Sequence, residues 1–406
     1  MVSITGNGGA SLTVHQWLQR TAPEYSKRFG PSMPGRQRQV LKRILACRTP
    51  ALGGQLFECP DCPGFLYRYH SCNDRHCPLC GQADADDWLA RQRARLLLPV
   101  PYFLATFTVP KELRMFIRSH LQIGLDLLFA CSAQALQDLA ATRLGAQLGM
   151  LGVAHTWTRT LIFHPHIHYL VPAGGLSPDG RRWVPASKFL LHHRALGDHC
   201  RTLCKERLLA EHPDLFRQVP SKVWKLHWNV GCQNAGSGQN ALRYLARYVF
   251  KTATPNKTLL RLPDGNLRWD YTESKTGKPA SIRLDPIEFM RRFLQHILPR
   301  GFARVRTFGW LHPAAKVRGN RVRALLRQEA LLTDAEKDTW LAPTDADPAP
   351  TLQPLTKNET TAACNTPFCP LCQKPTRLVA SWKGARAVIY PQSSVVALLT
   401  SDPRPP

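Results

Sequence analysis

The stretch that most constrains the fold of this chain is residues 161–171, which read LIFHPHIHYLV. On a β-strand, successive side chains point to opposite faces, so this stretch predicts an apolar face and an imidazole face. The apolar face comprises Leu161, Phe163, Ile167, Tyr169 and Val171, and the other face carries His164, His166 and His168. A lone histidine on a strand is usually a half-buried polar residue. Three in register opposite an apolar stripe indicate a metal site.

Spacing along the strand selects two ligands from the three histidines. The Cα atoms of His166 and His168 would lie about 7 Å apart, so both rings can turn toward one ion. His164 would lie about 13 Å from His168 along the strand, which is too far to share that ion easily. We therefore predict His166 and His168 as the ligand pair, with His164 outside it.

The charge of the chain indicates a polyanionic partner. Its 406 residues carry 54 Lys and Arg against 28 Asp and Glu, a net charge of +26, which makes nucleic acid the first candidate. Charge alone does not exclude a basic protein without chemistry. The length predicts two or three domains.

The sequence predicts a cytoplasmic protein without a membrane partner. Residues 1–17 lack the basic segment and apolar core of a signal peptide, and no run of eighteen or more apolar residues occurs. In a chain without a secretory signal, thirteen cysteines indicate metal ligands and free thiols rather than disulfides.

Residues 57–81, FECPDCPGFLYRYHSCNDRHCPLCG, contain two Cys-x-x-Cys pairs. Cys59 and Cys62 form one pair, Cys77 and Cys80 the other, and four such thiolates can close a tetrahedral Zn²⁺ site. The segment is too small to bury a core, so the metal would largely fold it. Cys72 and His76 are further ligand types that might replace a member of the set or bind a second ion.

A third Cys-Pro-x-Cys turn lies near the end of the sequence. Cys364, Cys369 and Cys372 follow a Pro- and Thr-rich stretch, residues 343–363, which reads as a linker. These three ligand types, without an evident fourth, form a candidate metal site.

Residues 239–253, QNALRYLARYVFKTA, read as a helix with a packing stripe of Leu242, Leu245, Ala246 and Val249. Tyr244 and Tyr248 are four residues apart and share one edge, which Lys251 continues. Taken alone, packing at the rim of a core is the commoner fate of such tyrosines. The candidate DNA contacts, which lie near aromatic residues, are Arg243, Arg247, Lys251, Arg291, Arg292, Arg304 and Arg306.

Periodicity gives the remaining elements. Helices are expected near residues 36–46, 84–97, 111–149 with a break near 130–132, 192–211, 286–299 and 313–328. Strands are expected near residues 102–110, 150–161, 223–230 and 301–310.

Several motifs in order resemble the insertion-sequence-91 family of rolling-circle transposases, which are HUH endonucleases. They are SCNDRHCPLC (71–80), HTW (155–157), FHPHIHYLVPAGGLS (163–177), YLARYV (244–249) and EFMRRFLQHILPRGFARVR (288–306). The resemblance covers about residues 36–311. His166-Ile167-His168 is similar to the histidine–hydrophobe–histidine motif of these enzymes.

The resemblance implies an α+β fold, with an HUH-like antiparallel sheet, packed helices and a small N-terminal zinc-ribbon-like module. The expected domains are 1–98 with the zinc module, 99–311 with the catalytic domain, 312–342 as a basic helical extension, and 343–406 as linker and tail. The family cleaves and rejoins single-stranded DNA at transposon ends through a 5′-phosphotyrosine, with target DNA as the second substrate. Tyr244 and Tyr248 would be the nucleophiles, and Mg²⁺ or Mn²⁺ would bind His166 and His168.

Two questions stay open at this stage. A third metal ligand is expected, and His155, His164, His227 and Glu288 are its candidates. The alternatives to a transposase are a plasmid replication initiator or relaxase with the same chemistry, and a zinc-dependent DNA-binding regulator without catalysis.

Overall fold

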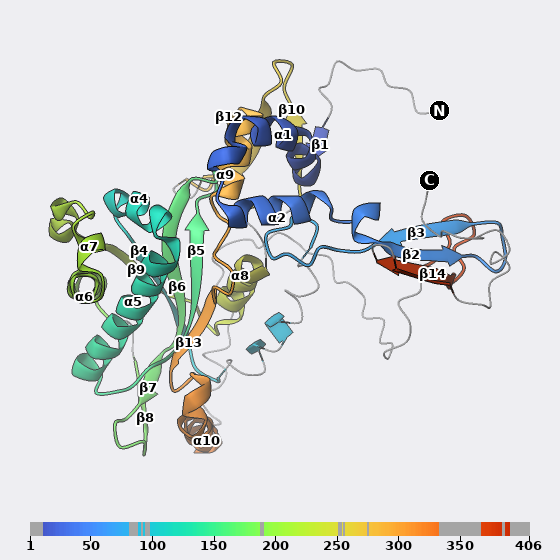
Figure 1. The fold of residues 1–406 in the computed structure, drawn as a ribbon. Coiled ribbons are helices and arrows are strands. Elements are labelled where there is room, and N and C mark those ends of the chain that lie inside the picture. Colours follow the sequence, from blue (N-terminus) through green and yellow to red (C-terminus); the bar gives the residue numbers. More distant parts are fainter. Residues whose placement is uncertain are drawn as a thin grey trace.

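An antiparallel sheet forms the centre of the molecule (Figure 1). The computed structural model describes residues 11–80, 88–90, 92–93, 98–186, 191–250, 254, 256–273, 276–332, 367–383 and 386–389. In spatial order, the five strands are β13 (Val305–Gly309), β5 (Gly149–Trp157), β6 (Phe163–Pro172), β4 (Tyr102–Thr108) and β9 (Asn229–Asn234). The histidine stretch is thus the middle strand, and the mixed helix and antiparallel-sheet class predicted from the sequence is confirmed.

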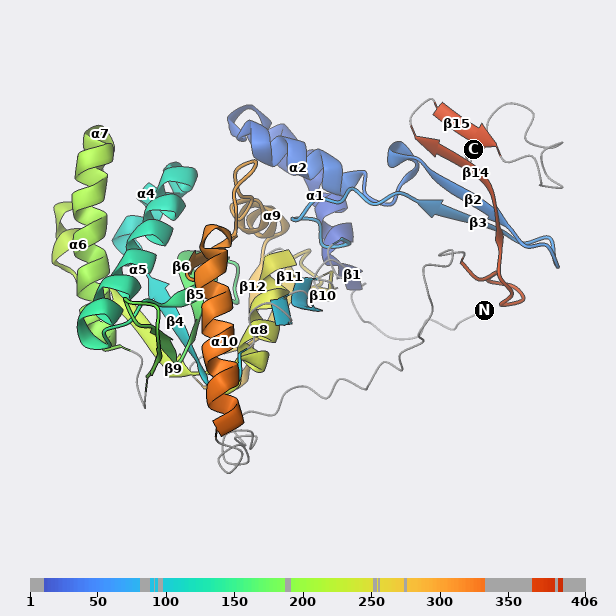
Figure 2. The same cartoon turned by 90° about the horizontal axis from the view of Figure 1, so that it is seen from below.

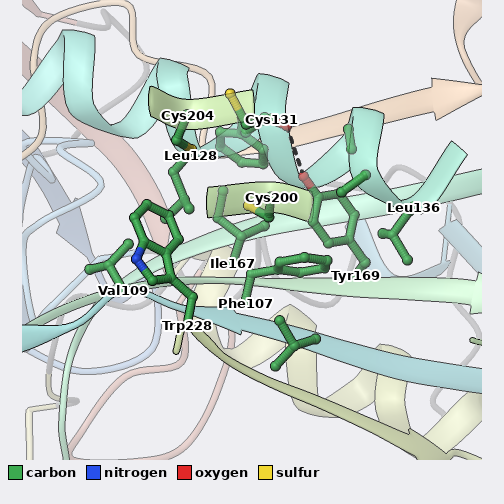
Figure 3. Close-up of a cluster of buried hydrophobic side chains, with 14 of the residues drawn as sticks. Phe107, Val109, Leu128, Cys131, Leu136, Ile167, Tyr169, Cys200, Cys204 and Trp228 are labelled. Carbon is green, nitrogen blue, oxygen red and sulfur yellow. Dashed lines mark hydrogen bonds between the residues drawn. The ribbon is translucent and has the colours of Figure 1, made fainter. Parts of the chain in front are cut away.

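Helices cover one face of this sheet. They are α4 (Lys111–Ser119), α5 (Leu121–Arg143), α6 (His193–Glu211) and α7 (Pro213–Phe216). Ile167 and Tyr169 of β6 are fully buried beneath them, with Phe107 of β4 alongside (Figure 3). Burying each such side chain contributes roughly 1.5–3 kcal/mol. The apolar face predicted for β6 is therefore the floor of the main core.

The opposite face is covered by α8 (Gln239–Phe250) and α10 (Lys316–Leu332), with the hairpin of β7 (Gly174–Leu176) and β8 (Trp183–Pro185). Leu242 and Leu245, two of the residues predicted to form the packing stripe of α8, are fully buried there. They pack in one cluster with Leu104 and Val153 of the sheet. The packing of α8 on the histidine face of the sheet fixes where its polar edge lies.

A second core joins residues 11–47 to residues 258–297. Its helices are α1 (Val14–Phe29), α2 (Gly35–Leu45) and α9 (Pro286–Leu294), and its sheet consists of β1 (Ser11–Thr13), β10 (Thr258–Arg261), β11 (Leu267–Thr272) and β12 (Pro279–Leu284). Trp17, Ile44 and Phe289 fill it. The N-terminal helices therefore pack against an insertion that follows α8.

A four-stranded ribbon lies beyond α2 (Figure 2). Its order is β15 (Arg386–Ile389), β14 (Arg377–Lys383), β2 (Gly54–Glu58) and β3 (Phe65–Tyr69). Figures 1 and 2 both place the late strands beside the early ones, and Arg377 is paired with Glu58 in the ladder. The tail is therefore part of the N-terminal ribbon.

Two secondary-structure predictions are wrong. The break in the helical stretch falls at His120, between α4 and α5, and not at residues 130–132. The predicted strand at residues 223–230 begins within a 3-10 turn, Ser221–Lys225, and is not a strand until β9 begins at Asn229. No helix in the described part of the chain has both the length and the apolar content needed to cross a bilayer.

Candidate functional site: a histidine cluster beside Tyr244

Three histidines converge on the α8 face of the sheet. His155, His166 and His168 have side-chain nitrogens that all lie within 4.8 Å of one another. His155 belongs to β5 and is the ladder partner of His166 on β6, so the strand register brings it into the pair. Its ring centre lies 4.4 Å from that of His168 and 5.1 Å from that of His166. Of the four candidates for the third ligand, His155 is therefore the one that the fold brings to the pair.

The other three candidates are not members of the cluster. His164 is not part of the cluster, as predicted from its spacing. His227 lies 3.6 Å from Asp198. Glu288 accepts from Arg291 and Arg292, and these contacts lower the pKa of its carboxyl to about 2.

Hydrogen bonds orient two of the imidazoles. The Nδ1 of His166 lies 2.6 Å from the carbonyl oxygen of His164, to which its N–H donates. The Nδ1 of His168 lies 2.8 Å from the hydroxyl of Thr106, its ladder partner on β4. The bond to the carbonyl oxygen leaves Nε2 of His166 with its lone pair, and Nε2 of His168 has its lone pair when Nδ1–H donates to the Thr106 hydroxyl. Nε2 of His168 is buried without a hydrogen-bond partner within the described residues. Outer partners of this kind hold ligand histidines in one orientation.

Burial keeps the three rings neutral. Removal from water disfavours the imidazolium, which lowers the pKa of His166 to about 4 and that of His168 to about 3. The pKa of His155 is lowered well below its ordinary value for the same reason. Neutral imidazoles are the form that binds metals, so the donor set fits a divalent ion at neutral pH. Three nitrogens suit Mn²⁺ or a later transition metal better than Mg²⁺.

Tyr244 projects from α8 toward this cluster. Its ring centre lies 5.7 Å from that of His168 and 6.4 Å from that of His155. With 37% of its surface exposed, Tyr244 borders both the cluster and solvent. The predicted partner Tyr248 lies one turn later on α8, but its side chain and those of Arg247 and Lys251 fall outside the described residues. Arg243 is half-exposed and donates to Asn240.

Three of the other arginines predicted to contact DNA lie away from the cluster, whereas Arg304 lies near enough to His155 to contribute to the lowered pKa of that imidazole. Arg291 and Arg292 are bound to Glu288, and Arg292 also donates to the carbonyl oxygen of Thr160. Arg304 is buried, with its guanidinium over the ring of Trp157. Arg306 pairs with Asp126 on the α5 face, away from the histidines. In contrast, Arg114 of α4, which the sequence did not single out, lies near enough to His164 and His166 to lower the pKa of both.

The cysteines form two clusters, and their membership corrects the predicted set. Cys77 and Cys80 lie with Cys72 and with Cys47, which the sequence analysis missed. Cys59 and Cys62 lie instead with Cys369 and Cys372 of the tail, whereas Cys364 falls outside the described residues. The predicted set failed because it paired neighbours in sequence. A single cysteine at the end of α2 and two others in a distant segment complete the sites.

His76, considered as a ligand, instead links the first cysteine cluster to the body of the molecule. Its Nδ1 lies 2.9 Å from a carboxylate oxygen of Asp74, and its Nε2 accepts from the backbone N–H of Leu298 at 3.2 Å. Burial lowers its pKa to about 4, so the ring is neutral. Arg75 adds a bond to the carbonyl oxygen of Phe302 at 2.9 Å. The cysteine turn is thus fastened to the segment that leads into β13.

Comparison with known proteins identifies the class. Residues 149–319 match the family described as "Putative transposase", and residues 17–109 match the "Transposase zinc-binding domain". The first span contains the histidine cluster and Tyr244, and the second contains all four cysteines of the Cys47 cluster. The fold, the site and these matches define a transposase, an enzyme that moves DNA segments, with an N-terminal zinc-binding domain.

Two similar sequences narrow the family of this transposase. The "Putative transposase y4qJ" of Sinorhizobium fredii is 35% identical over 339 residues, which cover 75% of this chain and 83% of the relative. The transposase for insertion sequence element IS801 of Pseudomonas savastanoi pv. phaseolicola is 30% identical over 292 residues, covering 67% and 70%. The chain belongs to the insertion-sequence-91 family of transposases, as the sequence motifs predicted. No solved structure matches the fold.

Proposed function

We propose that this transposase cleaves and rejoins single-stranded DNA at transposon ends through a 5′-phosphotyrosine, with Tyr244 as the first nucleophile. The observation that carries the proposal is the position of the Tyr244 ring, 5.7 Å from that of His168 at the edge of the histidine cluster. The phenol is held there by a helix whose apolar side is buried in the sheet. Nucleophile and metal ligands thus come from packed elements, which fix their separation.

His155, His166 and His168 are the residues that would hold a divalent ion. Bound Mg²⁺ or Mn²⁺ would supply positive charge that neutralises the phosphate and favours the phenolate form of tyrosine. A phenol has a pKa near 10, so it needs such help at neutral pH. The buried, neutral imidazoles contribute lone pairs without adding charge of their own.

The proposed reaction conserves the phosphodiester energy. The phenolic oxygen of Tyr244 attacks the phosphorus and loses its proton to solvent. A tyrosyl O–P bond forms, the bond from phosphorus to the 3′ oxygen breaks, and that oxygen takes up a proton to become a 3′-hydroxyl. The reverse attack by another 3′-hydroxyl rejoins the strand. Tyr248, one turn along α8, is proposed to act on the second strand, with Arg243, Arg247 and Lys251 as phosphate contacts.

Adduct formation with labelled single-stranded DNA that carries a transposon end tests this proposal in the presence of Mn²⁺. We expect a covalent adduct with the unmodified protein, and none with Tyr244→Phe, since the substitution removes only the attacking oxygen. Tyr248→Phe should still form the first adduct but transfer little of it to a second strand. Tyr271→Phe on β11 is the matched control, because it makes the same change outside the site. An adduct that survives in the Tyr244→Phe, Tyr248→Phe double variant would disprove the assignment.

A further inference from the structure

The second cysteine cluster draws its members from opposite ends of the chain. Cys59 and Cys62 follow β2, whereas Cys369 and Cys372 precede β14. Cys59 and Cys372 are separated by 313 residues. Residues 369 and 372 also lie beyond the span that matches the transposase zinc-binding domain, which ends at residue 109. The family match therefore covers Cys59 and Cys62 but not the two tail cysteines, and the proposed catalysis uses none of the four.

The two turns that carry these cysteines share one backbone geometry. In the first turn, the N–H of Cys59 donates to the carbonyl oxygen of Gly64 at 2.8 Å. In the second, the N–H of Cys369 donates to the carbonyl oxygen of Lys374, also at 2.8 Å. Each bond spans five residues and folds the intervening Cys-Pro-x-Cys around its own two sulfurs. The two turns therefore share both the Cys-Pro-x-Cys sequence and the backbone hydrogen bond around it.

Distances between sulfurs match thiolates around one ion. The Sγ atom of Cys59 lies 3.4 Å from that of Cys372, and the Sγ atom of Cys62 lies 3.5 Å from that of Cys369 and 3.7 Å from that of Cys372. With Zn–S bonds of about 2.3 Å, the sulfurs of a tetrahedral site lie about 3.8 Å apart. A disulfide would require about 2.05 Å, and all four thiols are free.

Contacts around the cluster hold the two turns in register. Glu58, which is buried beside Cys59, accepts from the Nε of Arg377 at 2.9 Å. Lys374 and Asp61 pair at 3.1 Å between the turns. A Cβ atom added at Gly64 would lie 2.9 Å from the Sγ of Cys369, so only glycine lets the second turn approach this closely. The four sulfurs are brought together by packing and charge that do not depend on an ion.

We propose that Cys59, Cys62, Cys369 and Cys372 bind a second structural zinc ion, which joins the tail to the N-terminal ribbon. Four soft sulfur donors select zinc over Mg²⁺ or Mn²⁺. A site closed by four protein ligands has no open position for substrate, so its role is to hold the two segments together. The Cys47, Cys72, Cys77 and Cys80 cluster is the first zinc site, and each chain then carries one ion in each cluster.

Zinc content of the full-length protein, measured by mass spectrometry of the metal, tests the proposal. We expect two zinc ions per chain, one for each cluster. The Cys369→Ser, Cys372→Ser variant should retain one, and the Cys77→Ser, Cys80→Ser variant should also retain one. Cys232→Ser is the matched control because Cys232 belongs to neither cluster, and it should retain both. Unchanged zinc content in the tail variant would overturn the proposal.

Alkylation of the unmodified protein gives a second readout that needs no variant. We expect Cys59, Cys62, Cys369 and Cys372 to become reactive together when a chelator removes zinc, without any reductant. Reaction only after a reductant would mean disulfides and would overturn the proposal. So would reaction of Cys369 and Cys372 before chelation, because exposed Cys372 would then be an unbound thiol.

Discussion

Thr106 is a residue that no sequence motif singles out, yet it decides how His168 is presented. Its hydroxyl lies 2.8 Å from Nδ1 of His168, which directs Nε2 toward the other two histidines. We expect Thr106→Val to weaken Mn²⁺ binding by roughly 10- to 100-fold, the usual effect of losing an outer partner of a ligand histidine. Thr106→Ser keeps the hydroxyl and should bind nearly as well. Calorimetric titration with Mn²⁺ measures both, and equal loss in the two variants would show that packing, not the hydroxyl, is what matters.

For single residues, the sequence could identify members of the candidate metal sites but not which other residues join them there. His166 and His168 follow from alternation along one strand, which is a local rule. His155 could not be preferred over three other candidates, because its place depends on the register between β5 and β6. Cys47 was missed for a similar reason. It ends a helix and joins the Cys72, Cys77 and Cys80 turn only through the packing of α2.

Among the elements, β6 serves the core with one face and the site with the other. Ile167 lies between the two cluster histidines of the strand but points into the main core, where it is fully buried. Ile167→Ala should destabilise the protein by about 2–5 kcal/mol, and Ile167→Val by about 0.5–1.5 kcal/mol. Mn²⁺ affinity of the folded protein should change little, since the histidines lie on the opposite face. Urea unfolding followed by circular dichroism measures the free energy of unfolding of both variants. An alanine variant no less stable than the valine variant would contradict the prediction.

Helices and strands whose apolar residues follow one regular spacing were predicted well. Elements whose apolar residues fit more than one spacing were not. The alternation of β6 and the Leu242 and Leu245 stripe of α8 each reflect a single face packed against one layer. The stretch 223–230 alternates too, but Val223 and Trp228 enter the main core from a 3-10 turn. A break was also predicted near residues 130–132. The helix continues there, with the Ser132 hydroxyl bonded to the carbonyl oxygen of Leu128 in the same helix and to the hydroxyl of Tyr169.

For the whole molecule, buried neutral histidines set its response to acid. His296 is the example: its Nε2–H donates to the carbonyl oxygen of Leu161 at 3.0 Å, and burial lowers its pKa to about 3. The unfolded chain has a histidine pKa near 6.5, so below pH 6.5 it binds the proton that the folded protein resists. Stability from this group is therefore complete above pH 6.5 and is lost progressively as the pH falls toward 3.

The variant His296→Gln tests whether the stability that His296 contributes is lost as the pH falls. At pH 7.5 it should be less stable than the unmodified protein by about 1–2 kcal/mol, because a buried hydrogen bond is disturbed. At pH 5 the gap should narrow, since glutamine does not titrate. Zinc dissociates from both the unmodified protein and the variant in acid. Its effect therefore largely cancels in the difference between their melting temperatures. A gap that widens in acid would contradict the assignment.

The expected domains were residues 1–98, 99–311, 312–342 and 343–406, each a continuous stretch of the sequence. In the structure, the second core and the ribbon each combine segments far apart in the chain. Pairing between distant strands leaves no local signature, because β2 and β14 each look like ordinary short strands.

The shared ribbon gives biosynthesis a fixed order. On a ribosome that adds about 5–20 residues per second, the 313 residues from Cys59 to Cys372 take roughly 15–60 s to emerge. Throughout that interval β2 has an open edge, and unpaired strand edges invite wrong partners. A transcript cut short before residue 377 yields a product whose ribbon never closes. The N-terminal ribbon is thus completed last, after all the strands of the central sheet have been synthesised.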